Sequence, residues 1–158
     1  QFQPLAAHSM ETLQQWHQQF MAEEIEPIWL AKAVALIESH RQQDDILLII
    51  TATNRFITEP IAQKLNIPHL IATEPEIIDG AYSGKVAGLP SYQAGKITRL
   101  NEWLKQQQIS MEGSTFYSDS HNDLPLLEHV DHPVAVDPDE TLRATANEQG
   151  WAILSLRD

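Results

Sequence analysis

The order of apolar and polar positions predicts alternating strands and helices along most of the chain. Residues 46–50 are apolar at every position, which is the pattern of a parallel strand buried on both faces, and this strand ends in Thr51. Helical spacing of apolar residues follows over 56–65, and a short strand is predicted at 69–72, so the region has the order of a βαβ unit. Further elements are predicted as strands at 115–117, 133–136 and 152–156 and helices at 92–107 and 140–148. This alternation predicts an α/β fold with an open, Rossmann-like parallel sheet and helices on both faces.

Two helices are predicted before the first strand. Residues 9–24 have apolar side chains at helical spacing, with Ser9 as the N-cap. Pro27 interrupts this helix, and a second one runs from about residue 28 to 41. Between residues 77 and 90, three glycines separate short β-prone pieces and predict a hairpin.

Composition limits the classes of function. The 158 residues are enough for one main domain with a sizeable core. Ten Lys plus Arg against 22 Asp plus Glu give a net charge of −12, which repels nucleic-acid backbones and argues against such a partner. The chain has no Cys, which suits a reducing cytoplasm, and its longest apolar run is too short to span a membrane. We therefore expect a soluble cytoplasmic protein that binds neither nucleic acid nor membrane.

Ligands of open α/β sheets bind at the carboxyl ends of the strands, so the residues after each apolar run are the first candidates for a site. After residues 46–50, the Thr51 hydroxyl and the backbone N–H groups of Ala52 and Thr53 are placed to bind a phosphate oxygen. The alternative is that Thr51 is a simple helix cap, the commoner role of an isolated Thr.

A second candidate site follows the strand at 115–117, where Asp119, Asn122 and Asp123 lie within five residues. Two neighbouring carboxylates repel each other unless a cation lies between them, and oxygen ligands suit Mg²⁺. The alternative is an Asx turn in which Asp123 caps a helix from Leu124. Lys96, at the start of a predicted helix, is either a solvated side chain or a point charge for phosphate and carboxylate.

Taken together, these segments resemble motifs II, III and IV of the haloacid dehalogenase superfamily, in their order. Residues 116–127 are similar to its Gly-Asp-x-x-Asn-Asp-x-x-Met/Leu signature, with Ser118 in place of Gly. Residues 78–84 resemble the Asp-Gly-x-x-x-Gly hairpin of the phosphoserine-phosphatase-like branch, and residues 134–151 resemble the ending of that branch. The resemblance covers about residues 25–158. It implies that residues 27–158 form the core domain and that residues 1–26 are the tail of a helical cap. Candidates to line the cap are Trp16, His17, Phe20 and Glu24, with the alternative that a Trp and a Phe at helical spacing are core residues.

The resemblance also implies roles for single residues in a phosphomonoesterase that acts on a small phosphorylated metabolite. Asp119 would ligate Mg²⁺, Thr51 would donate to a phosphoryl oxygen, and Lys96 would stabilise the nucleophile and the developing charge. Asp123 would orient Lys96 or a metal-bound water. The implied substrate-binding groups are Thr51, Ala52, Thr53, Lys96 and Asn122. Phosphoserine and histidinol phosphate are both substrates of enzymes in this branch.

One departure from the family concerns the nucleophile. The family begins with a strand that ends in Asp-x-Asp-x-Thr, and the only match here is Asp137 to Thr141, which follows motif IV and fits the ordinary ending of the branch. We therefore expect the segment with the nucleophilic aspartate to be missing from this chain, to act as its partner in the intact protein, and to leave the chain alone inactive. Asp119, and neither Asp137 nor Asp139, is expected to bind the cation.

Three further expectations depend on this reading. Thr51, Lys96, Asp119 and Asn122 should converge on one cleft. The strands at 46–50 and 115–118 should be separated by about two strand spacings, roughly 10 Å, and should not pair directly. The competing hypotheses are a phosphate-binding scaffold without turnover and a flavodoxin-like domain, whose paired acids would be expected after the first strand.

Overall fold

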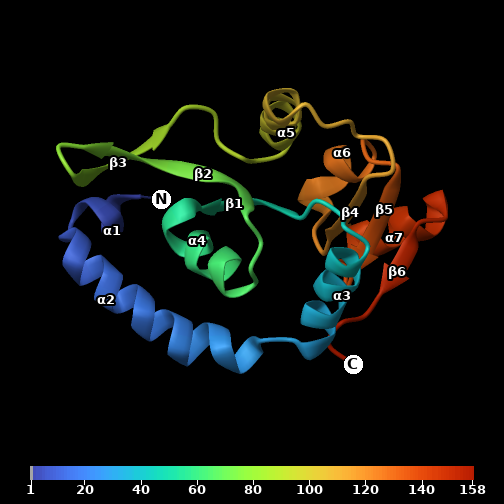
Figure 1. Ribbon diagram of the computed structural model, residues 1–158, viewed down its shortest axis with the longest axis horizontal. Coiled ribbons are helices and arrows are strands. Elements are labelled where there is room, and N and C mark those ends of the chain that lie inside the picture. The colour runs from blue at the N-terminus through green and yellow to red at the C-terminus, as the bar shows by residue number, and fades with distance from the viewer. Residues whose placement is uncertain (1) are drawn as a thin grey trace. The chain divides into compact units, whose positions relative to one another are not determined.

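A computed structural model describes residues 2–158, which form two compact units divided between Ser91 and Tyr92 (Figure 1). The strands belong to two three-stranded sheets, ordered β1-β2-β3 and β4-β5-β6. Parallel strands flanked by helices confirm the predicted α/β class. No ladder joins the two sheets among residues 2–158, in agreement with the expectation that the strands at 46–50 and 115–118 do not pair directly. The predicted boundary between a cap tail at 1–26 and a core at 27–158 stays a prediction.

The first unit contains the predicted βαβ unit, made of β1 (Leu48–Asn54), α4 (Arg55–Lys64) and β2 (His69–Ile78). Strand β1 pairs in parallel with β2 in regular register from Leu48↔His69 to Ile50↔Ile71, and the register shifts before Asn54↔Thr73. The strand begins two residues later than predicted, and Ile46 lies outside it with 55% of its surface exposed. Burial on both faces was also wrong, because every residue of β1 is half-buried or exposed. Helix α4 packs against this strand.

The predicted hairpin is confirmed. Strand β2 continues into an antiparallel pairing with β3 (Ala81–Ala87), and Ile78 pairs with Ala81. The two residues between them, Asp79 and Gly80, have φ of 50° and 81°, as the tight turns that match strand twist require. Gly84 in β3 has a φ of 87°, a conformation that residues with a side chain rarely adopt, and a Cβ there would lie 3.2 Å from the side chain of Gln3 and 3.3 Å from that of Ala6.

Helix α1 (Gln3–Ala6) therefore lies directly against the hairpin, and α2 (Met10–Phe20) follows it. Ser9 caps α2 as predicted, accepting a hydrogen bond from the Thr12 N–H at 3.2 Å. The helix passes through a π-helical turn, η1 (Met21–Ile25), and ends at Pro27 in a 3-10 turn, η2 (Glu26–Ile28), before α3 (Ala31–Gln42). His17 is buried, with Nε2 3.0 Å from the carbonyl oxygen of Ile57, so it packs in the interior of this unit.

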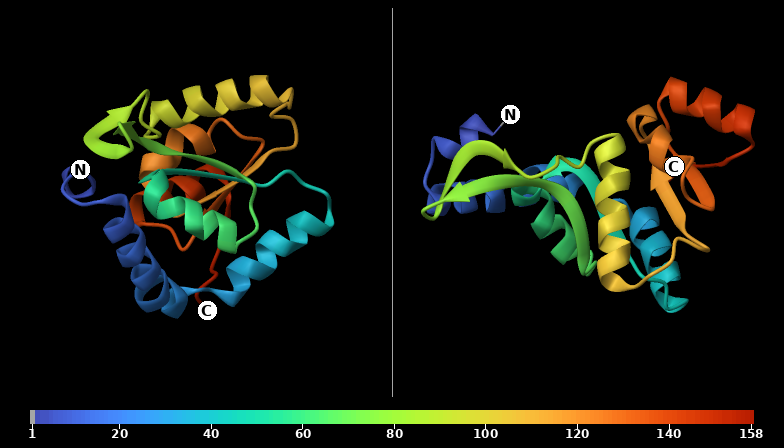
Figure 2. Two further views of the ribbon diagram at one scale, coloured as in Figure 1. Left: turned by 60° about the vertical axis from the view of Figure 1, so that its left-hand side comes forward. Right: turned by 90° about the horizontal axis from the view of Figure 1, so that it is seen from above.

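The second unit matches the predicted elements closely. Its elements are α5 (Ala94–Gln107), β4 (Thr115–Ser118), η3 (His121–Asp123), α6 (Leu124–Leu127), β5 (His132–Val136), α7 (Glu140–Gln149) and β6 (Ala152–Leu154). The three strands are parallel, with Tyr117 opposite Val134 and Ala135 opposite Ile153. Figure 2 shows α7 running alongside β5 and β6. Fully buried Leu127, Ala135, Leu142 and Ala146 form the core, where α6 and α7 meet the sheet.

Within residues 2–158, no helix has both the length and the apolar character that a membrane crossing requires.

Candidate active site

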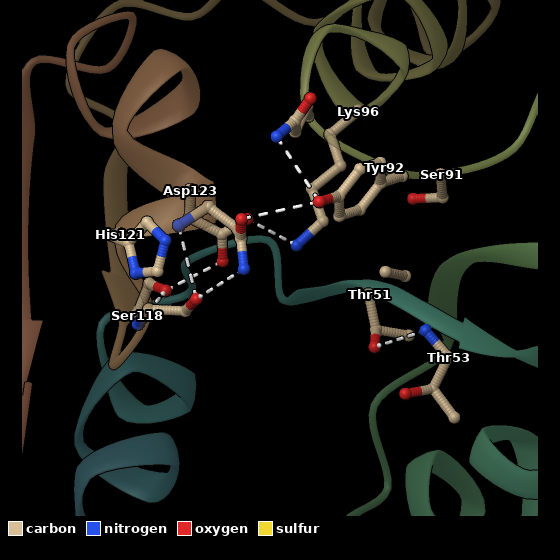
Figure 3. A network of polar contacts seen from close by, with 12 residues as sticks. Thr51, Thr53, Ser91, Tyr92, Lys96, Ser118, His121 and Asp123 are labelled. Atoms are coloured by element: carbon tan, nitrogen blue, oxygen red, sulfur yellow. Dashed lines mark hydrogen bonds and ion pairs between the residues drawn. The ribbon is translucent and has the colours of Figure 1, made fainter. Parts of the chain in front are cut away.

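Residues 51–53 lie in the irregular part of β1, just past its regular ladder with β2. The Thr51 hydroxyl oxygen accepts a hydrogen bond from the Thr53 N–H at 3.1 Å (Figure 3). A hydroxyl that accepts in this way still has its own proton to donate, for example to a phosphoryl oxygen. The helix cap is Asn54, whose side chain accepts from the Ile57 N–H, so the alternative reading of Thr51 as the cap was wrong.

The same geometry corrects the expected role of the neighbouring amides. Ala52 and Thr53 belong to the strand and do not form the entrance of α4, which begins at Arg55. The Thr53 N–H is already bonded to Thr51. Binding of a phosphate at these two amides therefore requires this short turn to rearrange.

Thr73 is a buried residue that sequence reasoning missed. Its hydroxyl donates to the carbonyl oxygen of Ala52 at 2.8 Å and accepts from the N–H of Ser91 at 3.1 Å. It thus supports the backbone next to Thr51 from the neighbouring strand. The available signal was a single hydroxyl directly after the apolar residues Leu70 to Ala72.

Lys96 is buried in the first turn of α5, so the reading of a solvated lysine was wrong. Its Nζ lies 2.6 Å from Oδ1 of Asp123, and the two side chains are 7% and 12% exposed. The other carboxylate oxygen of Asp123 accepts from the Ser118 hydroxyl at 2.7 Å. Asp123 makes no cap bond to α6, so the Asx-turn alternative was wrong as well. Ser118, at the position where the family signature has Gly, therefore helps to hold the partner of Lys96.

Asp119 follows β4 directly and is exposed. Its carboxylate has no hydrogen-bond or ion-pair partner within residues 2–158, and its backbone carbonyl accepts from the Asp139 N–H at 2.9 Å. Mg²⁺ in proteins is held by one or two carboxylates plus waters and substrate phosphate, so the donor chemistry of Asp119 fits this ion. The described residues contain no cluster of three or more His, Cys, Asp or Glu that would hold a metal by themselves.

Asn122 lies beside this loop. Its side-chain oxygen accepts a long hydrogen bond of 3.4 Å from the Tyr92 hydroxyl, and its amide nitrogen lies 3.3 Å from the Ser120 hydroxyl. Ser120 also accepts the backbone N–H of Asn122. The Asn122 side chain is thus held by Tyr92 and Ser120, and the second N–H of its amide group is available to a ligand.

The two acids of the Asp137–Thr141 match are engaged elsewhere. Asp139 caps α7, and its carboxylate accepts hydrogen bonds from the Leu142 N–H and the His121 N–H, both at 2.8 Å. These bonds, with Leu142 as the larger cause, lower the pKa of Asp139 to about 2. The Ser155 hydroxyl at 2.6 Å, followed by the Leu156 N–H, lowers the pKa of Asp137. Both carboxylates therefore accept hydrogen bonds from neighbouring parts of the second unit. The exclusion of Asp137 to Thr141 as the nucleophile motif stays a prediction.

The structure thus assembles the predicted residues in two groups. In the second unit, the loop that begins at Asp119 contains Asn122 and Asp123, and Lys96 pairs with Asp123. In the first unit, residues 51–53 lie together in β1. The convergence of Thr51 with the other three, and the spacing of about 10 Å between the strands that contain residues 46–50 and 115–118, stay predictions. No ladder joins β1 to β4 among the described residues.

Comparison with known proteins identifies the family. The family model of haloacid dehalogenase-like hydrolases matches residues 1–128. The chain is 44% identical over 158 residues to a histidinol-phosphatase of Neisseria meningitidis, covering 98% of this chain and 71% of that protein. It is 32% identical over 122 residues to a phosphoserine phosphatase of Mycobacterium tuberculosis, covering 77% of this chain and 40% of that protein.

A solved structure has the same fold. The crystal structure of a protein of unknown function from Bordetella pertussis Tohama I superposes with a TM-score of 0.94 at 43% identity, covering 96% of this chain and 70% of that one. The fold, the motif order and these relatives agree. The chain belongs to the haloacid dehalogenase-like hydrolases, in their phosphoserine-phosphatase-like branch.

Proposed function

We propose that this chain is part of a Mg²⁺-dependent phosphomonoester hydrolase that acts on a small phosphorylated metabolite through an aspartyl-phosphate. The observation that carries the proposal is the buried Lys96 ammonium, held 2.6 Å from Asp123, in the unit that also contains the exposed carboxylate of Asp119 directly after β4. Phosphoryl transfer needs a fixed cation and a carboxylate available to a metal ion, because its catalysis rests on positioning and charge stabilisation. The family and its phosphatase relatives support the same reaction.

In the proposed reaction, a carboxylate oxygen of an aspartate attacks phosphorus, the ester P–O bond breaks, and the alcohol leaves. Water then hydrolyses the aspartyl-phosphate to inorganic phosphate and regenerates the carboxylate. Lys96 stabilises the negative charge on the nucleophile and the phosphoryl oxygens, and Asp123 keeps its ammonium oriented. Thr51 donates its hydroxyl proton to a phosphoryl oxygen, and the Asn122 amide adds a donor. The N–H groups of Ala52 and Thr53 add donors only if the turn that bonds the Thr53 N–H to Thr51 rearranges.

Asp119 is the residue of this chain that we propose as the ligand of Mg²⁺. When bound, the ion screens the charge repulsion between a carboxylate nucleophile and a phosphate dianion. The position of Asp119 directly after β4, with no competing partner within residues 2–158, supports this role.

We propose that the nucleophilic aspartate comes from a segment of the same protein outside these 158 residues. Two observations support this: the carboxylates of Asp137 and Asp139 are engaged in hydrogen bonds, and β1 and β4 are both edge strands of their sheets. An edge strand has backbone groups available for a further strand. The same observations favour, for the chain by itself, the alternative of a phosphate-binding scaffold without turnover.

For the substrate, we propose histidinol phosphate first, because the relative at 44% identity is named a histidinol-phosphatase, and phosphoserine second. Both are small phosphomonoesters. We also propose a cytoplasmic location, with which the absence of Cys in the sequence agrees.

The test is release of inorganic phosphate by the intact protein from a panel of phosphorylated metabolites, with Mg²⁺ and with chelator. Lys96→Gln is expected to lower kcat/KM by about 10²–10³-fold. The matched control is Lys105→Gln, an exposed lysine on the same helix, which should leave the activity unchanged.

Two outcomes would contradict the proposal. Full activity of Lys96→Gln would remove Lys96 from the reaction. Binding of inorganic phosphate by the intact protein, without hydrolysis of any member of the panel, would establish the scaffold alternative.

A further inference from the structure

Asp139 connects the first turn of α7 to the loop that begins at Asp119. Its backbone N–H donates to the carbonyl oxygen of Asp119 at 2.9 Å. One of its carboxylate oxygens accepts the backbone N–H of His121 at 2.8 Å, and the ring Nδ1 of His121 lies 2.8 Å from the same oxygen. The other oxygen accepts the Leu142 N–H at 2.8 Å, as an N-cap does.

These contacts hold two backbone groups of the loop, the carbonyl of Asp119 and the N–H of His121. The carbonyl of residue 119 and the N–H of residue 121 are fixed to the same residue, so the backbone between them has little freedom to rotate. A helix cap needs only the bond to Leu142. The contacts to Asp119 and His121 go beyond capping, and they act on the residue whose carboxylate is exposed and open.

Asp137 provides an internal comparison. It lies two residues earlier in the same turn and also accepts two hydrogen bonds, but from Ser155 and Leu156 at the end of β6. Its carboxylate makes no hydrogen bond to residues 119–121 among those that the structure describes. The two acids of this turn thus bind different segments: Asp139 binds the loop at residues 119–121, and Asp137 binds the segment after β6.

We propose that Asp139 is a positioning residue that fixes the loop at residues 119–121 and thereby the direction of the Asp119 carboxylate. The part of this inference that concerns Mg²⁺ rests on the proposed function, whereas the fixing of the loop does not. Partners that orient a metal ligand typically change metal affinity or activity by 10–100-fold when they are removed.

The experiment compares Asp139→Ser with Asp137→Ser in the intact protein. Serine is a good N-cap, so Asp139→Ser can retain the cap of α7, but its side chain is too short to bind His121 as well. The first readout is amide hydrogen exchange without metal. The His121 N–H is expected to exchange at least about tenfold faster in Asp139→Ser, as loss of a hydrogen bond to a charged group predicts, and at the wild-type rate in Asp137→Ser.

The second readout is the Mg²⁺ concentration that half-saturates phosphatase activity. It should rise by about 10–100-fold in Asp139→Ser and stay within about twofold of wild type in Asp137→Ser. Asp139→Asn serves as a second variant if Asp139→Ser does not fold, because its single side-chain oxygen retains the cap but leaves the His121 N–H without a full acceptor.

Equal His121 exchange rates and equal Mg²⁺ half-saturation in the Asp139 and Asp137 variants would overturn the inference. If the wild-type protein shows no Mg²⁺-dependent activity, the proposed function fails, and the His121 exchange rate still decides whether Asp139 fixes the loop.

Discussion

Nζ of Lys96 lies 2.6 Å from Oδ1 of Asp123, and both side chains are nearly excluded from solvent. Removing one partner of such a pair leaves an uncompensated buried charge, which typically costs 3–5 kcal/mol. We expect Lys96→Met and Asp123→Leu each to lower the free energy of unfolding by about this amount, and the double variant to lose much less than the sum. The coupling is measured as a double-mutant cycle, from the free energies of urea unfolding of the wild type, the two single variants and the double variant. Additive losses, within about 0.5 kcal/mol, would mean that the pair is not coupled.

Ser118 should stabilise this pair from the other side. Its hydroxyl donates to Oδ2 of Asp123 at 2.7 Å, so Ser118→Ala leaves a nearly buried carboxylate oxygen with one partner fewer. The expected loss is about 1–3 kcal/mol in urea unfolding. Ser110→Ala, at an exposed position of the same unit, is the control and should lose much less. Equal losses would show that the bond to Asp123 has no net effect.

Thr51 is expected to act through its hydroxyl. Thr51→Val keeps the shape but removes both the acceptor of the Thr53 N–H and the proton available to a phosphoryl oxygen. We expect kcat/KM of the intact protein to fall by about 10²–10³-fold, the usual effect of losing one donor to the transition state. Thr51→Ser should restore most of this activity, while Thr98→Val, on the exposed surface of α5, should change it little. A Thr51→Ser variant as impaired as Thr51→Val would indicate a packing role.

The low pKa of Asp139 predicts a pH dependence of stability. The Leu142 and His121 N–H groups lower this pKa from 3.8 to about 2 in the folded protein. The folded state therefore binds fewer protons at this site than the unfolded state, so its contribution is present above about pH 4 and is lost as the pH falls towards 2. The Tm difference between wild type and Asp139→Asn should be largest near pH 5 and should shrink over this window. A difference that does not change with pH would contradict the assignment.

The periodicity of apolar residues predicted the helices and strands well, but it did not predict which side chains contact each other across the fold. Strands and helices of the second unit lie close to their predicted ranges because each is set by local spacing of apolar residues. The pairing of Lys96 with Asp123 was expected only from the family resemblance, because the two residues are 27 positions apart and no local pattern reports such a pair. Thr51 was read as a possible helix cap because nothing local marks that β1 continues to Asn54.

Burial of the first strand was overestimated for a related reason. A run of apolar residues indicates that a strand has the side chains for two covered faces, but not which neighbours are present to cover them. In the structure, β1 is half-buried, and Ile46 lies outside it and is exposed. The role of Asp139 was also beyond sequence reasoning, because its contacts to Asp119 and His121 join two turns that are distant in the chain.

The edge position of β1 has a consequence for how the chain behaves at high concentration. Leu48, Ile49 and Ile50 are apolar, without Pro or charge, and their ladder with β2 occupies one side of the strand. An apolar strand with an open side is a template for a strand from another molecule, and short stretches of this kind start ordered aggregation. The net charge of −12 opposes that growth by mutual repulsion. Added salt should therefore promote association of this chain by screening the repulsion, and a strand bound along β1 should suppress it.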